Sequence, residues 1–367
     1  MKKLLALLFA FGLIAAACGS SADTATEGDA GGDADDAAEG EEEAMEDEED
    51  GEAMADGPEE INVAYFAAWP LPPQIGQEDG SFAEAVGVDS INWVPLNSGG
   101  EMAEAMIAGE VDISYSMGLT PFANNVNSGA ELSLVGIAVA YAEADNCIAQ
   151  GDLGVTRENA AEVLAGETVV TPIGNVTHFK MLSIMDFLGV DVSTLNVVPA
   201  EGGAATAAAF VGGEIGVGCA FGGSIVDMTD AGGVPILTGA ETESEVGIRT
   251  YDITAIPDSF GDAHPEIVTN FLAATQEFTD TWEADPATNN PIIATAAGME
   301  DVGNFLAGDT WFTFPNIEEQ LSDDWMGNNV ASVMKDQVDF FVEQGEVEAA
   351  LADFSPFIDT SFLEAVG

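Results

Sequence analysis

The sequence predicts an α/β protein with two lobes and a helical C-terminal tail. From residue 61 onward, short runs of β-forming residues alternate with helical patterns, which favours parallel sheets covered by helices. The alternation occurs in two successive blocks, and only helical patterns follow the second block. The length is sufficient for two hydrophobic cores, so we expect one lobe at 61–140 plus 250–367 and the other at 141–249.

The first block predicts the elements of the first lobe. One helix is expected to end at Gly87, and the helix at 101–109 places Met102 and Met106 on one face before a glycine stop. A further helix begins at Pro121. The expected strands are 61–66, 91–96, 111–116 and 132–140.

The second block repeats the pattern, and the tail then becomes helical. The expected strands are 147–150, 168–171, 195–198, 215–220, 234–237 and 250–256. The expected helices of this block are 177–188, 204–212 and one that begins at Gly223. In the tail, the expected helices are 265–284, 291–297, 299–307 and 330–344.

The N-terminal segment is typical of an exported lipoprotein. Two lysines precede an apolar run at 4–17, which is too short to span a bilayer but has about the length of the apolar h-region of a signal peptide. The run ends in Ala-Ala-Ala-Cys, which resembles a bacterial lipobox, although Leu is usual three residues before the Cys. We expect 1–17 to be the signal peptide and Cys18 to carry a lipid that anchors the protein at the outer face of the cytoplasmic membrane or in the periplasm. An ordinary signal peptide beside a chance Cys is the alternative.

Acidic residues dominate the rest of the chain, whose formal net charge is −60. Residues 20–60 contain 19 acids and no Lys or Arg, so we expect 18–60 to be a disordered tether, with a cation-binding tail as the alternative. Residues 61–367 carry 47 acids against four bases. Such a surface repels nucleic acid and anionic membranes, and it suggests adaptation to a saline habitat.

The cysteines and histidines restrict the chemistry further. With Cys18 assigned to the lipid, Cys147 and Cys219 remain, and an exported domain with one such pair favours a disulfide over two buried thiols. The sequence has two histidines, and neither lies at ligand spacing from a Cys, so no metal site is expected. No cofactor is expected either.

Candidate binding residues lie in the turns after the expected strands, where α/β sheets hold ligands against helix N-termini. Helix starts and hydroxyl groups could bind an anion, and a carboxylate could bind an ammonium group. Aromatic rings could exclude water, so the set of residues suits a small zwitterion. Each residue also has a structural interpretation: the threonines as helix caps, Trp69 as packing and His178 as a core residue. The candidates are Trp69, Gly118, Thr120, Thr177, His178, Phe221 and Asp252.

The motifs of 61–367 resemble the taurine-binding proteins of the nitrate/sulfonate/taurine group of ABC transporters. The motifs include INVAYF, AEAMIAGEVDISYSMGLTPFANNVNSGA, GETVVTPIGNVTHFKML, GGEIGVGCAFGG and TYDITAIPDSFGDAHPEIV. The resemblance implies a type II periplasmic-binding-protein-like fold, a monomer, and delivery of a ligand to a permease with a cytoplasmic ATPase. It implies that Asp252 holds the taurine amine and that the cysteine pair is bridged. Leu119 and Val176 replace hydroxyl residues, and Phe221 stands where Trp is common.

Three alternatives accompany this interpretation. The ligand could instead be an alkanesulfonate, a thiamine-pyrimidine precursor or nitrate, although a carboxylate at Asp252 opposes the ligands that lack a positive end. An enzyme is a second alternative, but the sequence contains no Ser/His/Asp arrangement, metal cluster or phosphate loop. A structural surface lipoprotein is the third. The expected mechanism is closure of the two lobes around the ligand.

Overall fold

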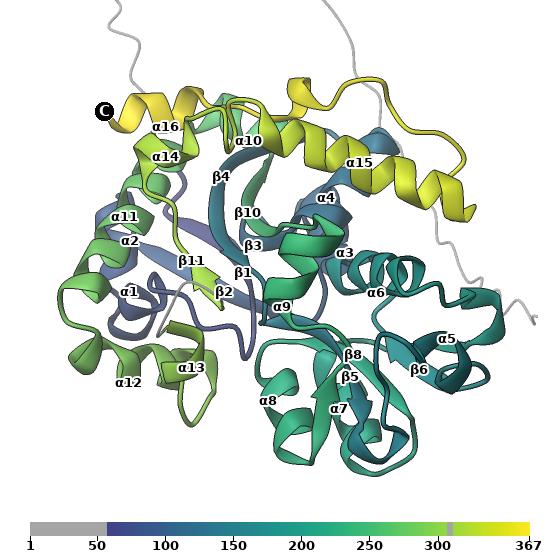
Figure 1. The fold of residues 1–367 in the computed structure, drawn as a ribbon. Coiled ribbons are helices and arrows are strands. Elements are labelled where there is room, and N and C mark those ends of the chain that lie inside the picture. The colour runs from purple at the N-terminus through teal and green to yellow at the C-terminus, as the bar shows by residue number, and fades with distance from the viewer. Residues whose placement is uncertain (1–56, 307–310) are drawn as a thin grey trace, which may run out of the picture. The chain divides into compact units, whose positions relative to one another are not determined.

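The first sheet is built from strands that lie at both ends of the folded chain. The computed structural model describes residues 57–306 and 311–367, and these described residues belong to one compact unit. The strand order of this sheet is β11-β4-β10-β3-β1-β2 (Figure 1). Its strands are β1 (Glu60–Phe66), β2 (Ser90–Leu96), β3 (Ile113–Gly118), β4 (Leu132–Tyr141), β10 (Thr250–Pro257) and β11 (Phe312–Thr313).

The second sheet comes entirely from the middle of the chain. Its strand order is β7-β6-β8-β5-β9. Its strands are β5 (Asp145–Gln150), β6 (Thr168–Thr171), β7 (Asn196–Pro199), β8 (Val217–Phe221) and β9 (Gly233–Pro235). The α/β fold class with two sheets and a helical tail is therefore as the sequence predicts. The expected signal peptide, Cys18 and most of the expected acidic tether lie outside the described residues.

The sheets are mixed, whereas the sequence pattern predicted parallel ones. β10 runs antiparallel to β3 and β4, and β5 runs antiparallel to β8 and β9. The parallel strands β1, β2 and β3 are joined by helices, as a parallel connection requires. β5 instead follows β4 after a turn of three residues. Because β5 comes directly from the first sheet, it runs away from that sheet, in the direction opposite to its neighbours β8 and β9.

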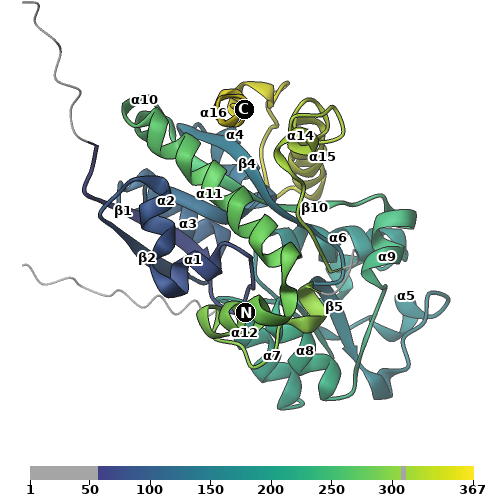
Figure 2. The ribbon, with the colours of Figure 1, turned by 90° about the vertical axis from the view of Figure 1, so that its left-hand side faces the viewer.

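Helices cover the first sheet on both faces. Figure 2 shows α1, α2, α11 and α12 together on one side, and contacts join α1 to α12 and α2 to α11. These elements are α1 (Gln74–Asp79), α2 (Ser81–Val86), α11 (Pro265–Ala284) and α12 (Pro286–Ala297). The other helices of this part are α3 (Gly99–Ile107), α4 (Leu119–Asn127), α10 (Asp258–Ala263), α13 (Gly303–Leu306), α14 (Ile317–Gln320), α15 (Asn329–Gln344) and α16 (Ser361–Val366).

The second sheet has a separate hydrophobic cluster on each face. Phe179 and Met185 of α6 belong to one cluster, and Phe210 of α7 and Met228 of α8 belong to the other. The α-helices of this part are α5 (Ala160–Val163), α6 (Val176–Phe187), α7 (Gly203–Val211), α8 (Gly223–Asp230) and α9 (Gly239–Glu241). The disulfide between Cys147 and Cys219 joins β5 to β8 within this sheet.

The C-terminal helix α15 contacts both halves of the fold. On the first half it packs against α4, where the Thr120 hydroxyl donates a hydrogen bond of 3.1 Å to the side chain of Gln337. On the second half, Phe341 is buried in a cluster with residues of α6, and its ring lies 6.2 Å from that of Phe179. The helical tail therefore links the two sheets and is not an appendage of the first.

Two tail helices differ from their expected bounds. The expected helix at 299–307 is reduced to α13, because Gly298 in the left-handed conformation ends α12 and the Asp301 carboxylate accepts from the Gly303 N–H. α12 begins at Pro286, five residues before the predicted start. Asp285 caps it by accepting from the Thr288 N–H, and proline is favourable in the first turn.

Candidate functional site

A small pocket lies where the two sheets face each other. It receives the C-terminal ends of β1, β3, β4 and β8 and the N-terminal ends of β5 and β10. The empty space between its lining atoms is about 270 Å³. The lining residues are Phe66, Trp69, Gly99, Gly118, Pro121, Tyr141, Asp145, Asn175, Val176, Phe221 and Asp252.

Asp252 contributes a buried carboxyl group to this pocket. β10 carries it, and the hydroxyl of Tyr141 on the neighbouring strand β4 donates a hydrogen bond of 2.9 Å to its Oδ1 atom. Burial raises the pKa of Asp252 well above its usual value, and the nearby Asp145 charge raises it further, although the Tyr141 bond opposes the shift. Burial also raises the pKa of Tyr141, so its hydroxyl keeps the proton that it donates.

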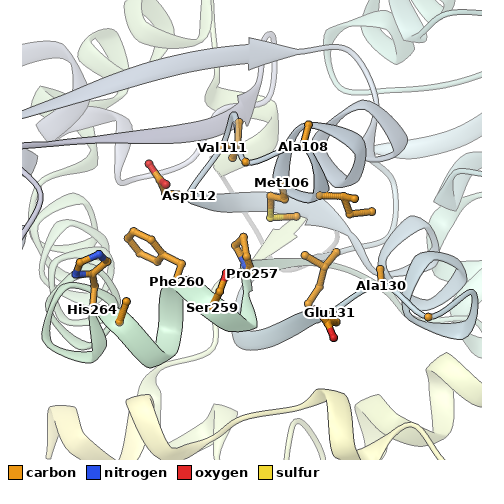
Figure 3. Close-up of a pocket in the computed structure, with 15 residues that line it drawn as sticks. Met106, Ala108, Val111, Asp112, Ala130, Glu131, Pro257, Ser259, Phe260 and His264 are labelled. Atoms are coloured by element: carbon orange, nitrogen blue, oxygen red, sulfur yellow. The ribbon is translucent and has the colours of Figure 1, made fainter. Parts of the chain in front are cut away.

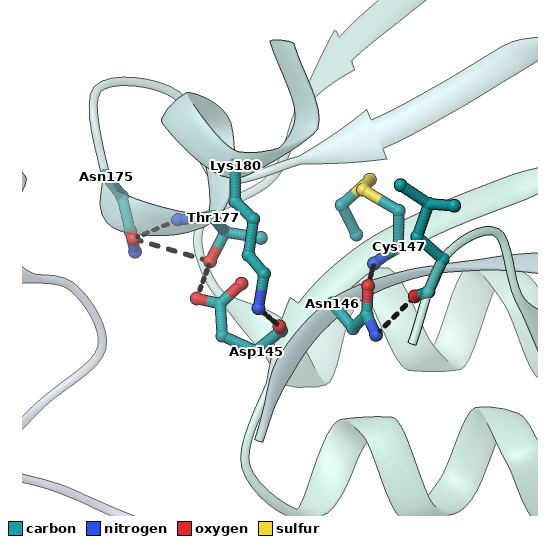
Figure 4. Close-up of a disulfide and its surroundings, with 8 residues drawn as sticks. Asp145, Asn146, Cys147, Asn175, Thr177 and Lys180 are labelled. Carbon is teal, nitrogen blue, oxygen red and sulfur yellow. Dashed lines mark hydrogen bonds between the residues drawn. A yellow bond between two sulfur atoms is a disulfide. The ribbon is translucent and has the colours of Figure 1, made fainter. Parts of the chain in front are cut away.

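Asp145 contributes a second buried carboxyl group, at the start of β5. Its Oδ2 atom accepts a hydrogen bond of 2.7 Å from the Thr177 hydroxyl (Figure 4). The Lys180 ammonium donates to two main-chain carbonyls, those of Ala142 and Asp145, and its charge lowers the Asp145 pKa. Burial outweighs both interactions and raises the pKa of Asp145 to about 6. The pocket therefore holds two carboxyl groups that burial makes costly to ionise.

Two buried polar atoms at the pocket have no partner within the described chain. They are the Oδ1 atom of Asp145, a hydrogen-bond acceptor, and the Nε1–H group of Trp69, a donor. A buried polar atom without a partner costs about 1–3 kcal/mol. A ligand that offers both a cationic donor and an anionic acceptor would satisfy both atoms. The aromatic rings around Trp69, among them Tyr141 at 5.0 Å between centroids, would exclude water from those contacts.

Two backbone features bring the pocket walls together. Ala68 has a φ of 57°, and it alone among the described non-glycine residues adopts a positive φ. It turns the chain after β1 so that Trp69 enters the pocket. Gly118 precedes α4, and a Cβ atom there would lie 2.7 Å from the Val176 side chain. Glycine thus permits the uncapped N-terminus of α4 to approach α6, and its free N–H groups suit an anion.

The structure brings four predicted site residues to the pocket and places three behind its wall. Trp69, Gly118, Phe221 and Asp252 line it. The other three are buried and bonded within the protein. Thr120 donates to Gln337, Thr177 donates to Asp145, and the Nδ1 atom of His178 accepts from the Gly174 N–H at 3.2 Å.

Sequence reasoning missed Asp145 and Tyr141. Asp145 is the first residue of the apolar strand β5, and a carboxylate in such a strand requires a partner, which is the argument that selected Asp252. That signal was available in the sequence. Tyr141 gave none, because its role depends on the antiparallel pairing of β4 with β10, in which Tyr141 lies opposite Thr250.

The disulfide confirms the predicted pairing and stiffens one wall of the pocket. Cys147 and Cys219 lie directly opposite each other on β5 and β8, and their sulfur atoms are bonded. The same register places Asp145 opposite Phe221, two residues away, and both of these residues line the pocket. The bridge therefore fixes the relative position of a carboxyl group and a ring at the site.

A larger surface hollow lies at the far edge of the first sheet (Figure 3). Its volume is about 1170 Å³, and it receives the beginning of β4 at Leu132 and the end of β10 at Pro257. Both strands reach the small pocket at their opposite ends, Tyr141 and Asp252. The hollow therefore lies on the edge of the sheet opposite to the one where α/β folds bind ligands.

Within the described residues, no group of His, Cys, Asp and Glu could hold a metal ion, and no helix is long and apolar enough to cross a bilayer.

The fold is that of the periplasmic substrate-binding proteins. The alkanesulfonate-binding protein SsuA from Xanthomonas axonopodis pv. citri, solved with bound MOPS, superposes with a TM-score of 0.67 at 16% identity. The match covers 82% of this chain and 98% of that one. A desulfurization enzyme shares the fold at a TM-score of 0.55 and 11% identity, over 84% of this chain and 98% of its own.

In sequence, the chain resembles the taurine-binding periplasmic protein of Escherichia coli strain K12. The two are 23% identical over 313 residues, which cover 83% of this chain and 92% of the relative. No family model matches the chain. The resemblance that the motifs predicted is confirmed at the level of this relative and this fold.

Proposed function

We propose that this protein binds taurine or a closely related aminosulfonate outside the cytoplasm and delivers it to an ABC importer. The observation that carries the proposal is the pairing of two buried carboxyl groups, Asp145 and Asp252, with the partnerless N–H of Trp69 in one small pocket. Sequence similarity to a taurine-binding protein and the fold of an alkanesulfonate-binding protein support the same ligand class.

The charges of the pocket select among sulfonates. An ammonium group placed between Asp145 and Asp252 would restore both carboxylates to their ionised form and would satisfy the free Oδ1 atom of Asp145. The sulfonate would accept from the Trp69 Nε1–H and from the start of α4. Nitrate and simple alkanesulfonates lack the ammonium, so they would bring an anion beside two buried carboxyl groups without supplying the cation that those groups need in order to ionise.

Ligand binding by the purified chain tests the proposal. We expect taurine to bind with micromolar or tighter affinity in calorimetric titration, because it has both charged ends. Ethanesulfonate, which lacks the amine, and ethanolamine, which lacks the sulfonate, should each bind at least about 100-fold more weakly, as expected when a buried charged group loses its partner. Equal affinity for taurine and ethanesulfonate would refute the role of the carboxyl groups, and binding of a pyrimidine or nitrate alone would reassign the ligand.

An enzymatic role is the second candidate, because a desulfurization enzyme shares the fold. The pocket residues oppose it. The described lining residues include no Cys, Ser, His or Lys that could act as a nucleophile or a general base. The disulfide occupies both described cysteines. Release of sulfite from taurine by the protein would favour this candidate.

We also propose that the protein is exported and anchored by a lipid on Cys18, which lies outside the described residues. The short apolar segment, the small residues before Cys18 and the acidic stretch after it support an anchor on a tether. In a bacterial host that processes lipoproteins, a clickable palmitate analogue should label the full chain, and Cys18→Ser should abolish the label and release the protein from membranes. Persistent membrane association of unlabelled Cys18→Ser would contradict the anchor.

A further inference from the structure

A second hollow adjoins the ligand pocket, and two phenylalanine rings lie between them. The hollow has a volume of about 800 Å³ and is lined by the turn after β1, the end of β2 and the start of α7. Among the described residues, Phe66 and Phe221 alone line both spaces. Their ring centroids are 5.5 Å apart, so the rings are in contact.

The two rings come from different sheets. Phe66 ends β1 in the first sheet and is 6% exposed, whereas Phe221 ends β8 in the second sheet and is only partly buried. Phe66 belongs to the large core cluster, and Phe221 packs on its edge. The two rings together form a partition between the pocket and the hollow, and the partition is complete only when the two sheets are as close as they are in this structure. Phe221 has less support from the core than Phe66.

The backbone next to Phe221 fixes the position of this ring. Gly222 has a φ of 60°, and a Cβ atom there would lie 2.6 Å from the carbonyl oxygen of Ala68. The Gly223 N–H donates to the same oxygen at 3.4 Å. This contact between the turn after β1 and the turn after β8 holds Phe221 against Phe66, so backbone packing supports the partition.

We infer that the Phe66–Phe221 pair sets the upper size limit of the ligand, confining it to the inner pocket and excluding aminosulfonates longer than taurine. The inference rests on the proposed function. Without the Phe221 ring, the pocket would open into the neighbouring hollow, because Phe66 and Phe221 are the described residues that line both spaces. Gly202 and Gly203, which have no side chains, line the hollow, and Glu201 is the charged residue among those that the structure describes there. The additional methylene groups of a longer aminosulfonate would fit this space.

The test compares taurine with 4-aminobutanesulfonate, which is longer by two methylene groups. In calorimetric titrations, wild-type protein should prefer taurine, and Phe221→Ala should weaken taurine while strengthening the longer ligand. We expect the ratio of the two dissociation constants to change by at least about tenfold, since one methylene in a closed pocket is worth about 10- to 200-fold. Phe221→Leu provides a milder change in the same direction if the alanine variant folds poorly.

The matched control is Phe187→Ala, which removes an exposed ring from the same sheet region and lines neither space. It should leave the ratio unchanged. An unchanged ratio in both Phe221 variants, with taurine still bound by the wild type, would overturn the size limit. Failure of the wild type to bind any aminosulfonate would instead refute the proposed function.

Discussion

Replacing Asp252 with Asn should weaken taurine binding by at least about 100-fold, because an ammonium in a buried site loses a charged partner. The substitution keeps the shape of the side chain and an acceptor for the Tyr141 hydroxyl, which lies 2.9 Å from the Asp252 Oδ1 atom. The amide carries no charge, so the ligand-free protein should melt at the same temperature or higher. Calorimetric titration and thermal melting of the ligand-free variant check the two parts.

The control for this prediction is Asp186→Asn, which neutralises an exposed carboxylate of α6 that does not line the pocket. It removes one negative charge from this acidic chain, as Asp252→Asn does, so any general effect of charge on a cationic group appears in both variants. Taurine affinity that falls equally in both would show that Asp252 acts only through the overall field. An unaltered affinity in Asp252→Asn would remove this carboxylate from the site.

Acidification should weaken taurine binding by about tenfold per pH unit for each proton that the ligand must displace, and therefore by up to about a hundredfold per unit below pH 6, where Asp145 and Asp252 both hold a proton. Burial raises the pKa of Asp145 to about 6, and that of Asp252 well above its usual value. Protons therefore compete with the ammonium of the ligand for both carboxylates. Binding at pH 7 should also release protons. Calorimetry from pH 4 to pH 8 in buffers of different ionisation enthalpy measures the affinity and the proton count.

The same pKa shift acts on the ligand-free fold in the opposite sense to ordinary acid denaturation. The folded state holds the Asp145 proton more tightly than the unfolded state, in which the pKa is near 3.8. Its contribution to the free energy of unfolding is therefore complete below pH 4 and is lost as the pH rises through 6. The difference between the folded pKa of about 6 and the unfolded pKa of 3.8 makes this change about 3 kcal/mol.

The control for both readouts is Asp145→Asn, which lacks the proton. Urea unfolding of the two proteins at matched pH isolates this contribution from the repulsion among the other acids. Equal unfolding free energies at pH 4 and pH 6 relative to the variant, together with a taurine affinity that does not change with pH, would contradict the assignment of Asp145.

Local patterns in the sequence fixed the elements and several of the site residues. Helix 265–284 and strand 168–171 were predicted at the bounds that the structure has, because each has its own hydrophobic pattern and its own stop signals. The disulfide was predicted from the number of cysteines together with the expected export of the chain. Asp252 was recognised as a candidate because a carboxylate within an apolar strand requires a partner.

Tertiary structure alone decided the direction of β5 and β10, the hydrogen bond between Tyr141 and Asp252, and the partition formed by Phe66 and Phe221. These features join residues that are far apart in the sequence, such as Tyr141 and Asp252 at a separation of 111 residues. The sequence determined that the chain forms two α/β blocks with polar and aromatic residues at the strand ends. Which of those residues meet depends on how the sheets approach, and that approach is set by long-range packing that no local periodicity encodes.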